Sequence, residues 1–218
     1  MKKIVSIIIL AGSVLTSYAS DPNDHSLLSL KPLSDGGQCF DESSHIINLG
    51  FGFGGVSYYR GYRGTGYDYG RSPAFSLSYE QPWREKVGPG FLGLGVYAGF
   101  QTEHSNYRGY YYNGVNYTYD YRWNHYIIAA RAAYHWDVLN LDNVELYGGL
   151  IMGLSFQTHS YTTTDPYPNN DHSWYGRSVY PAFSLFAGGR WYFVNKVALF
   201  GEFGYGISYA TLGLSFKI

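Results

Sequence analysis

The sequence predicts an all-β fold, an eight-stranded antiparallel transmembrane β-barrel. Its 218 residues are 20% aromatic and 14% charged, with 25 Tyr and 28 Gly, and this composition is typical of strands and turns rather than of helices or disorder. Apolar residues alternate with small or polar ones in segments of about ten residues, the length of a tilted membrane strand. The net charge of −1 provides no basic footprint, so no nucleic-acid partner is expected.

The N-terminus has the pattern of an export signal. A basic start and a short apolar run are followed by small residues that end at Ala19. The run is too short to span a membrane as a helix. We therefore expect a signal peptide at 1–19, a flexible periplasmic segment at 20–44 and the barrel at 45–218. Cys39 is the only cysteine, so it either pairs with another chain or has an incidental role.

Eight segments alternate with a period of two. They cover residues 46–58, 72–83, 91–103, 122–138, 145–158, 181–193, 197–207 and 210–218. One face of each is large and apolar, and Ile207 is assigned to this face. The other face is mostly Gly, Ser and Ala with isolated charges. A soluble β-sandwich would carry Lys, Glu and Thr there, whereas a small crowded face fits the inside of a narrow barrel.

The connections favour the same fold. Long, Tyr-rich links at 61–71, 107–121 and 159–177 alternate with short links at 84–90, 139–143 and 194–196. This is the pattern of long external loops and short periplasmic turns. Two aromatic girdles are expected, and their members are Trp83, Trp136 and Trp191 on the periplasmic side and Tyr121, Trp123 and Trp174 on the outer side.

One turn predicts an irregular register. Asn113-Gly114 is a strong signal for a two-residue hairpin, which pairs Tyr112 with Val115. The flanking segments nevertheless both direct their even-numbered residues towards lipid. One extra residue is needed to reconcile the two, and we predict a β-bulge around Arg108-Gly109.

Isolated charges lie on the inward face of the predicted barrel. They are Glu80, Glu103, Arg131, Glu145, Arg190, Glu202 and Lys217, with Asp137 near the periplasmic rim. Buried charges must pair or recruit water, which predicts a plug of ion pairs. A gated or proton-conducting path is the alternative, because ionisable groups within a membrane often serve function.

No catalytic, cofactor or metal site is expected. His104, His159 and His172 are each followed by Ser, but neighbours in a strand point to opposite faces, which is poor geometry for a nucleophile and its base. The spacing of Asp165, Asp171 and His172 does not match a metal site. The glycines between residues 50 and 55 lie in an alternating strand rather than before a helix, as a nucleotide loop requires.

The outer links are exceptionally rich in tyrosine. Seven of the fifteen residues from Tyr107 to Tyr121 are Tyr. Tyr offers a large contact area at low entropic cost, so these residues are candidate binding contacts. The candidates are Tyr107, Tyr110, Tyr111, Tyr112, Tyr117 and Trp174. The alternative is that the strands extend above the membrane, with Tyr paired across the hairpin.

The stretches from Ala198 to Gly206 and from Leu212 to Ile218 carry a family resemblance. Over about residues 46–218 the chain resembles the small outer-membrane β-barrels of Gram-negative bacteria, of the OmpX and OmpA-barrel type. The resemblance implies an outer-membrane location, contact with lipid and a C-terminal signal for the barrel-assembly machinery. The residues of that signal are Leu214, Phe216 and Ile218.

The expected function is non-enzymatic. A plugged barrel would support the envelope and present its outer loops for adhesion or for a partner. A narrow porin-like channel, a lipid A-modifying enzyme and an accessory subunit of a larger envelope complex are the alternatives. Because one fold hosts many activities, the architecture does not choose among them.

Overall fold

The computed structural model describes residues 39–55, 67–83, 86–112, 115–136, 143–164 and 176–218. The expected signal peptide, most of the segment that follows it, Asp137, Trp174 and the acidic pair Asp165 and Asp171 lie outside these residues. No helix in the described part of the chain has the length and apolarity of a membrane span.

In the described part of the chain, nine strands form one antiparallel sheet that closes into a ring. They are β1 (Ile46–Phe53), β2 (Tyr67–Arg71), β3 (Ala74–Pro82), β4 (Gly90–Tyr112), β5 (Val115–Trp136), β6 (Val144–Thr163), β7 (Gly176–Val194), β8 (Val197–Tyr205) and β9 (Ala210–Lys217). Both β2 and β3 pair with β4, so they act as two pieces of one strand. The ring order is β4-β3-β1-β9-β8-β7-β6-β5, and pairing of β5 with β4 closes it, which confirms the predicted eight-stranded barrel.

The outward face of the ring is apolar. Large side chains on it are widely exposed, among them Ile128 at 65%, Met152 at 61% and Phe203 at 74%. Trp83, Trp136 and Trp191 also point outward, near the short connections. In lipid, every backbone polar group must find a partner within the protein, and a closed antiparallel ring provides this. This combination of apolar surface and closed ladder belongs in a lipid bilayer.

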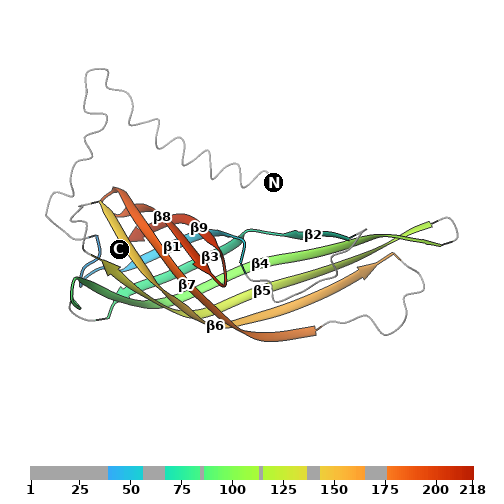
Figure 1. Ribbon diagram of the computed structural model, residues 1–218, viewed down its shortest axis with the longest axis horizontal. Helices are drawn as coiled ribbons and strands as arrows, with labels where there is room; N and C mark the ends of the chain where they lie inside the picture. The colour runs from blue at the N-terminus through green and yellow to red at the C-terminus, as the bar shows by residue number, and fades with distance from the viewer. Residues whose placement is uncertain (1–38, 56–66, 84–85, 113–114, 137–142, 165–175) are drawn as a thin grey trace, which may run out of the picture. The chain divides into compact units, whose positions relative to one another are not determined.

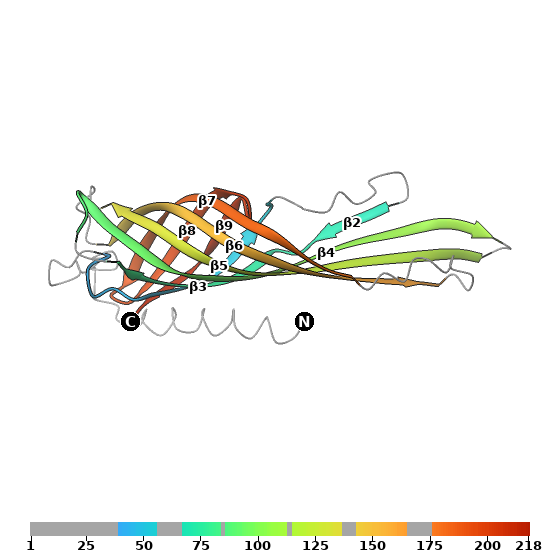
Figure 2. The same cartoon turned by 90° about the horizontal axis from the view of Figure 1, so that it is seen from below.

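The strands differ greatly in length, and the sequence-based boundaries underestimate the longest ones. The hairpin of β4 and β5 continues to Tyr112 and Val115, far beyond the ends of β1, β8 and β9 (Figure 1; Figure 2). Residues 107–121, expected as a loop, are therefore mainly strand, as in the alternative of strand extension. The predicted bulge is confirmed, because the register shifts between Arg108 and Tyr110 while Tyr112 pairs with Val115.

The connection between β8 and β9 folds into the barrel. Ile207 is only 9% exposed and joins the buried core, so its assignment to the lipid face was wrong. The reason is local, because β8 ends at Tyr205 and the alternation ends with it. Gly206 has a φ of 127°, and a Cβ there would collide with the carbonyl oxygen of Phe183. Glycine thus lets the turn approach β7 and direct Ile207 inward.

The barrel interior holds large side chains as well as the small ones expected. A buried apolar cluster combines Tyr97, Tyr147, Ile151 and Phe186 with alanines and Ile207. Trp123 is 5% exposed and also points inward, which corrects its assignment to the outer girdle. It shares its parity along β5 with the buried His125, and this parity places both on the inward face.

The segment before β1 packs against the barrel. Phe40 is 3% exposed and contacts Phe91, and Ser44 is fully buried. We call residues 39–44 the N-terminal clasp. The clasp corrects part of the expectation for residues 20–44, because its residues contact the strands instead of extending from them.

Candidate functional site

Arg131 is the centre of a group of buried charges in the lumen. Its guanidinium Nε lies 3.0 Å from Glu80 Oε2 on β3, and its Nη2 lies 2.6 Å from Glu202 Oε1 on β8. The same guanidinium lies 4.1 Å from the centre of the Phe186 ring. Tyr147 donates a hydrogen bond of 2.9 Å to Glu202. The Arg131 guanidinium therefore links β5 to β3 and to β8 across the lumen. Its Nε faces one carboxylate and its Nη2 faces the other.

Arg190 on β7 forms the second centre. It lies 2.9 Å from Glu145 Oε2 and 3.4 Å from Glu80 Oε1. Its Nε donates to the Ser215 hydroxyl on β9, which in turn donates to Asn48 on β1. A fully buried guanidinium would be costly without such partners. Arg190 thus extends the network to the two strands that close the ring.

His135 completes this group, which we call the charged core: Glu80, Arg131, His135, Glu145, Arg190 and Glu202. Its Nε2 lies 3.0 Å from Glu80 Oε1, and its Nδ1 is hydrogen-bonded to Glu145. The imidazole is 2% exposed. His135 is not among the inward charges that the sequence predicted. Its position four residues after Arg131 on the same face of β5 was the available signal.

Glycines on the neighbouring strands leave space for these charged side chains. A Cβ at Gly93 on β4 would lie 2.8 Å from His135 Nε2 and 3.0 Å from Glu80 Cγ. A Cβ at Gly188 on β7 would lie 2.8 Å from Glu202 Cγ. All three distances are shorter than ordinary contacts. The small inward residues of the sequence therefore provide the volume that the charged core fills.

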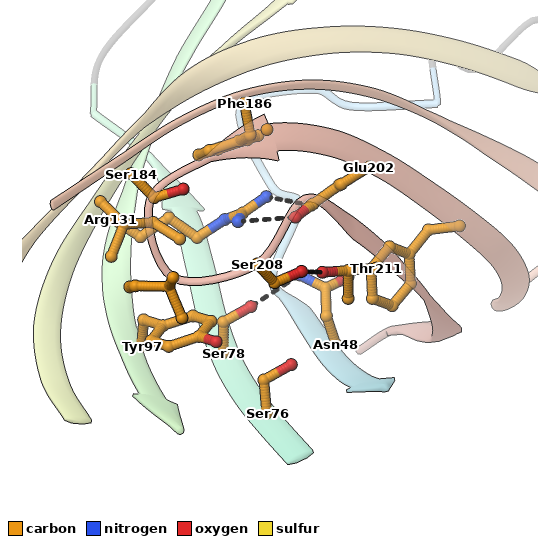
Figure 3. A pocket seen from close by; sticks show the side chains of 14 residues that line it. Asn48, Ser76, Ser78, Tyr97, Arg131, Ser184, Phe186, Glu202, Ser208 and Thr211 are labelled. Carbon is orange, nitrogen blue, oxygen red and sulfur yellow. Dashed lines mark hydrogen bonds and ion pairs between the residues drawn. The ribbon is translucent and has the colours of Figure 1, made fainter. Parts of the chain in front are cut away.

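A small cavity, lined by both polar and apolar side chains, lies beside the charged core (Figure 3). Its lining combines Arg131 and Glu202 with the hydroxyls of Ser76, Ser78, Ser184, Ser208 and Thr211. Ser208 and Thr211 contact each other at 2.8 Å, and Asn48 donates to Ser78 at 3.0 Å. The cavity offers about 20 Å³, room for one or two water molecules but not for a solute.

Glu103 belongs to a separate group towards the long strand ends. It lies 3.2 Å from Arg71 Nε, and Arg71 also donates to Gln101 and to the Gly55 carbonyl. His125 Nε2 is 4.0 Å from the other carboxylate oxygen of Glu103. Glu103 was expected in the same set as Glu80, but the structure pairs it elsewhere. Arg71, which was not among the predicted inward charges, is a basic partner of Glu103 among the described residues.

Lys217 also lies outside the charged core. Its ammonium is 2.9 Å from Asp41 of the N-terminal clasp, so it binds the clasp to β9. Partial burial raises the pKa of Asp41, but hydrogen bonds from Ser43 and Lys217 outweigh this effect and lower the pKa to about 2. Asp41 is therefore ionised at neutral pH. The predicted set thus divides into three groups, of which only Glu80, Arg131, Glu145, Arg190 and Glu202 meet.

The extended strands form a second candidate surface. Tyr107, Tyr119, Tyr121 and Tyr161 lie on the face continuous with the lumen, and ring centres of cross-strand neighbours are 4.9–6.4 Å apart. Tyr121 also stacks on Trp123 at 5.9 Å. We call these five residues the aromatic ladder. Tyr117 is half-buried, and the side chains of Tyr110, Tyr111 and Tyr112 lie outside the described residues.

His104 and Ser105 are neighbours in β4 and point to opposite faces of the strand. His104 is exposed and its ring lies over Gly70, whereas Ser105 is 4% exposed on the opposite face of β4. His159 lies over Gly176, and His172 is outside the described residues. Among the described residues, no group of three or more His, Cys, Asp or Glu side chains has the arrangement of a metal site.

The predicted C-terminal signal residues lie on the last strand or directly after it. Leu214 and Ile218 point outward, with 39% and 64% of their surface exposed, and Phe216 pairs with Ile47 on β1. Leu214 and Phe216, two positions apart, thus share the outward side of β9, and Ile218 directly follows the strand.

Solved structures resemble this chain, although no family model and no curated protein matches its sequence. The crystal structure of Ail, the attachment invasion locus protein of Yersinia pestis, is 15% identical and covers 82% of this chain and 99% of Ail, with a TM-score of 0.42. Ail in complex with the heparin analogue sucrose octasulfate is 13% identical and covers 80% and 97%, with a TM-score of 0.40. The N-terminal β-barrel domain of Pseudomonas aeruginosa OprF is 15% identical and covers 81% and 98%, with a TM-score of 0.37.

The closed ring of strands and its apolar outer surface indicate the membrane in which the protein is located. A closed antiparallel barrel with an apolar outer surface is the architecture of outer-membrane proteins. This chain is an outer-membrane β-barrel protein. The resemblance to small outer-membrane barrels that its sequence shows is therefore matched by its fold.

Proposed function

We propose that this protein is a non-enzymatic barrel whose lumen is closed by the charged core. The observation that carries the proposal is the span of the network. Contacts of Arg131 and Arg190 connect β3, β5, β6, β7, β8 and β9, and Ser215 extends them to β1. Side chains that bridge a narrow ring in this way leave little room for a solute path.

A structural role in the envelope follows from this closure. The charged core stabilises the ring from within, and lipid covers its outside. Insertion of the protein into the outer membrane would use Leu214, Phe216 and Ile218 as the signal for the barrel-assembly machinery. The short connections then lie in the periplasm and the long strand ends outside the cell.

Planar-bilayer recordings test the plug. The refolded wild type is expected to show no stable conductance, whereas Arg131→Ala should leak because it removes the guanidinium that faces Glu202 and leaves Glu80 with Arg190 as its guanidinium partner. Arg122→Ala is the matched control, since Arg122 is exposed on the outer surface. Stable channels in the wild type would exclude the plug and favour a narrow pore with a charged selectivity filter.

We further propose that the aromatic ladder binds an extracellular partner. Aromatic side chains that are rigid, half-buried and held above a membrane are suited to adhesion. A double variant, Tyr119→Ser with Tyr161→Ser, should fold but reduce attachment of producing bacteria to a cultured cell monolayer. Ile128→Ser with Met152→Ser changes the lipid face instead and should leave attachment per folded molecule unchanged. Equal attachment of both variants would contradict the proposal.

A further inference from the structure

His135 lies between two carboxylates. Its Nδ1 is hydrogen-bonded to Glu145, and its Nε2 is 3.0 Å from Glu80, an ion-pair contact rather than an aligned hydrogen bond. A neutral imidazole has one N–H, and an ionised carboxylate can only accept. Its second nitrogen would then direct a lone pair at a carboxylate oxygen. Two protons on the ring turn both contacts into attractive ones.

The balance of charges in the charged core also favours a His135 ring with two protons. Its three carboxylates, Glu80, Glu145 and Glu202, face only two guanidiniums. One negative charge therefore remains, at a depth where unpaired charge is strongly unfavourable. A protonated His135 makes the group neutral.

The other titratable groups around His135 do not supply this charge. Among the described residues they are Tyr147 on β6, Tyr192 on β7, and Cys39 and Asp41 of the clasp with Lys217 on β9. Lys217 is engaged by Asp41, and the phenolic hydroxyls of the two tyrosines carry no charge near neutral pH. The strand β4 contributes glycine and Phe91 at this level.

The N-terminal clasp covers the imidazole. The Phe40 ring stacks on His135 with centres 3.7 Å apart and planes 5° apart, and its edge meets Phe91 at 6.4 Å. An aromatic face also favours a cation against it. The Asp41–Lys217 pair and the turn from Asp41 to Ser44 hold Phe40 in this position.

We propose that His135, Glu80 and Glu145 form a proton-binding site at the mouth of the lumen, and that the N-terminal clasp is the lid of this site. Loss of the proton leaves the charged core with a net negative charge and two opposed lone pairs. The clasp then opens, and the mouth becomes accessible from the side that the clasp covers. The proton site is independent of the proposed plug, whereas any change in conductance on opening rests on it.

NMR of ¹⁵N-labelled histidine in the refolded barrel tests the site directly. The His135 resonances, assigned by their loss in His135→Gln, should show two ring protons at about pH 8, where an ordinary histidine is neutral. The exposed His104 is the internal reference. A His135 ring with one proton at about pH 7 would overturn the proposal, whatever the conductance of the barrel.

Alkylation of the native Cys39 thiol tests the lid. With rates normalised to N-acetylcysteine at each pH, wild type should react slowly near neutrality and roughly tenfold faster once His135 loses its proton. His135→Gln, which keeps a polar side chain but cannot carry the charge, should already react at the faster rate. Phe40→Ala retains the charged core and should react fast at every pH. A normalised rate independent of pH in wild type and equal in all three proteins would overturn the lid.

Discussion

The two ends of this barrel are stabilised in different ways. In the charged core, side chains meet across the ring, and Arg190 contacts Glu80 although 110 positions separate them in the chain. In the extended part, β4 and β5 are stabilised by their ladder and by side-chain pairs between adjacent strands, such as Tyr107 with Tyr119. The first arrangement depends on every strand being present. The second depends only on neighbours, so the extended part can vary in sequence without affecting the ring.

Loss of a charge from the charged core is the largest expected effect. Arg190→Met should lower the free energy of unfolding by about 3–5 kcal/mol, because Glu145 and Glu80 remain buried with one cation fewer. Urea titration of the barrel refolded in lipid vesicles measures this. Arg122→Met, on the exposed surface, should change it by no more than about 0.5 kcal/mol. Similar losses in both variants would show that burial of the pairs is not what stabilises the ring.

Loss of space in the charged core should have the next largest effect. In Gly93→Ala the new methyl group would press on His135 and Glu80, at an expected cost of about 1–3 kcal/mol. Gly201→Ala on β8 is the matched control, because its Cβ would find only Leu212 Cδ2 at 3.4 Å, an ordinary contact. The same urea titration compares the two. If Gly201→Ala costs as much as Gly93→Ala, backbone effects of glycine explain both losses.

Changes to the aromatic ladder should cost less. Tyr121→Ala removes contacts with Trp123 and Tyr161, worth about 0.5–1.5 kcal/mol together, and leaves the ring intact. Hydrogen exchange should show faster opening of the extended strands and unchanged protection near Arg131. Accelerated exchange throughout the ring would contradict the independence of the two ends.

Loss of the Asp41 charge from the clasp should have the smallest effect on the free energy of unfolding, and this effect should depend on pH. Asp41 has a pKa lowered from 3.8 to about 2, so its contribution is complete above the higher value and is lost as the pH falls towards the lower one. Asp41→Asn should therefore be slightly less stable than wild type at neutral pH, and the gap should close in acid. Glu42→Gln, at an exposed neighbouring position, should show no such convergence.

The sequence predicted the ring of strands better than it predicted the side-chain contacts in the lumen. Period-two alternation identified which residues face lipid, from Leu49 to Leu214, because a buried and a lipid-facing side differ sharply in polarity. The same rule identified the inward charges. It did not predict which charges meet, since this depends on how far each strand is staggered around the barrel. Glu103 and Lys217 for this reason pair outside the charged core.

The remaining errors have local causes. Above the membrane both faces of β4 and β5 are polar or tyrosine-rich, so alternation provides no contrast and the strand ends were placed too early. Ile207 follows a glycine that breaks the alternation. Phe40 lies in a polar segment, and nothing in its neighbours predicts that it reaches His135. By contrast the bulge was predictable, because two parity rules conflicted at Arg108.

The pairing of β1 with β9 has a consequence for biogenesis. The first and last strands close the ring through Ile46–Lys217 and the pairs that follow, and Ser215 donates to Asn48 across 167 positions. Closure of this kind is a late, slow event, since distant parts of the chain must find each other. Until the final strand arrives, Arg190 lacks its serine partner and the seam lies open to solvent or lipid. A chain truncated before β9 would therefore expose its charges and unpaired edges, and so would be readily distinguished from a finished barrel by the proteases that remove failed intermediates.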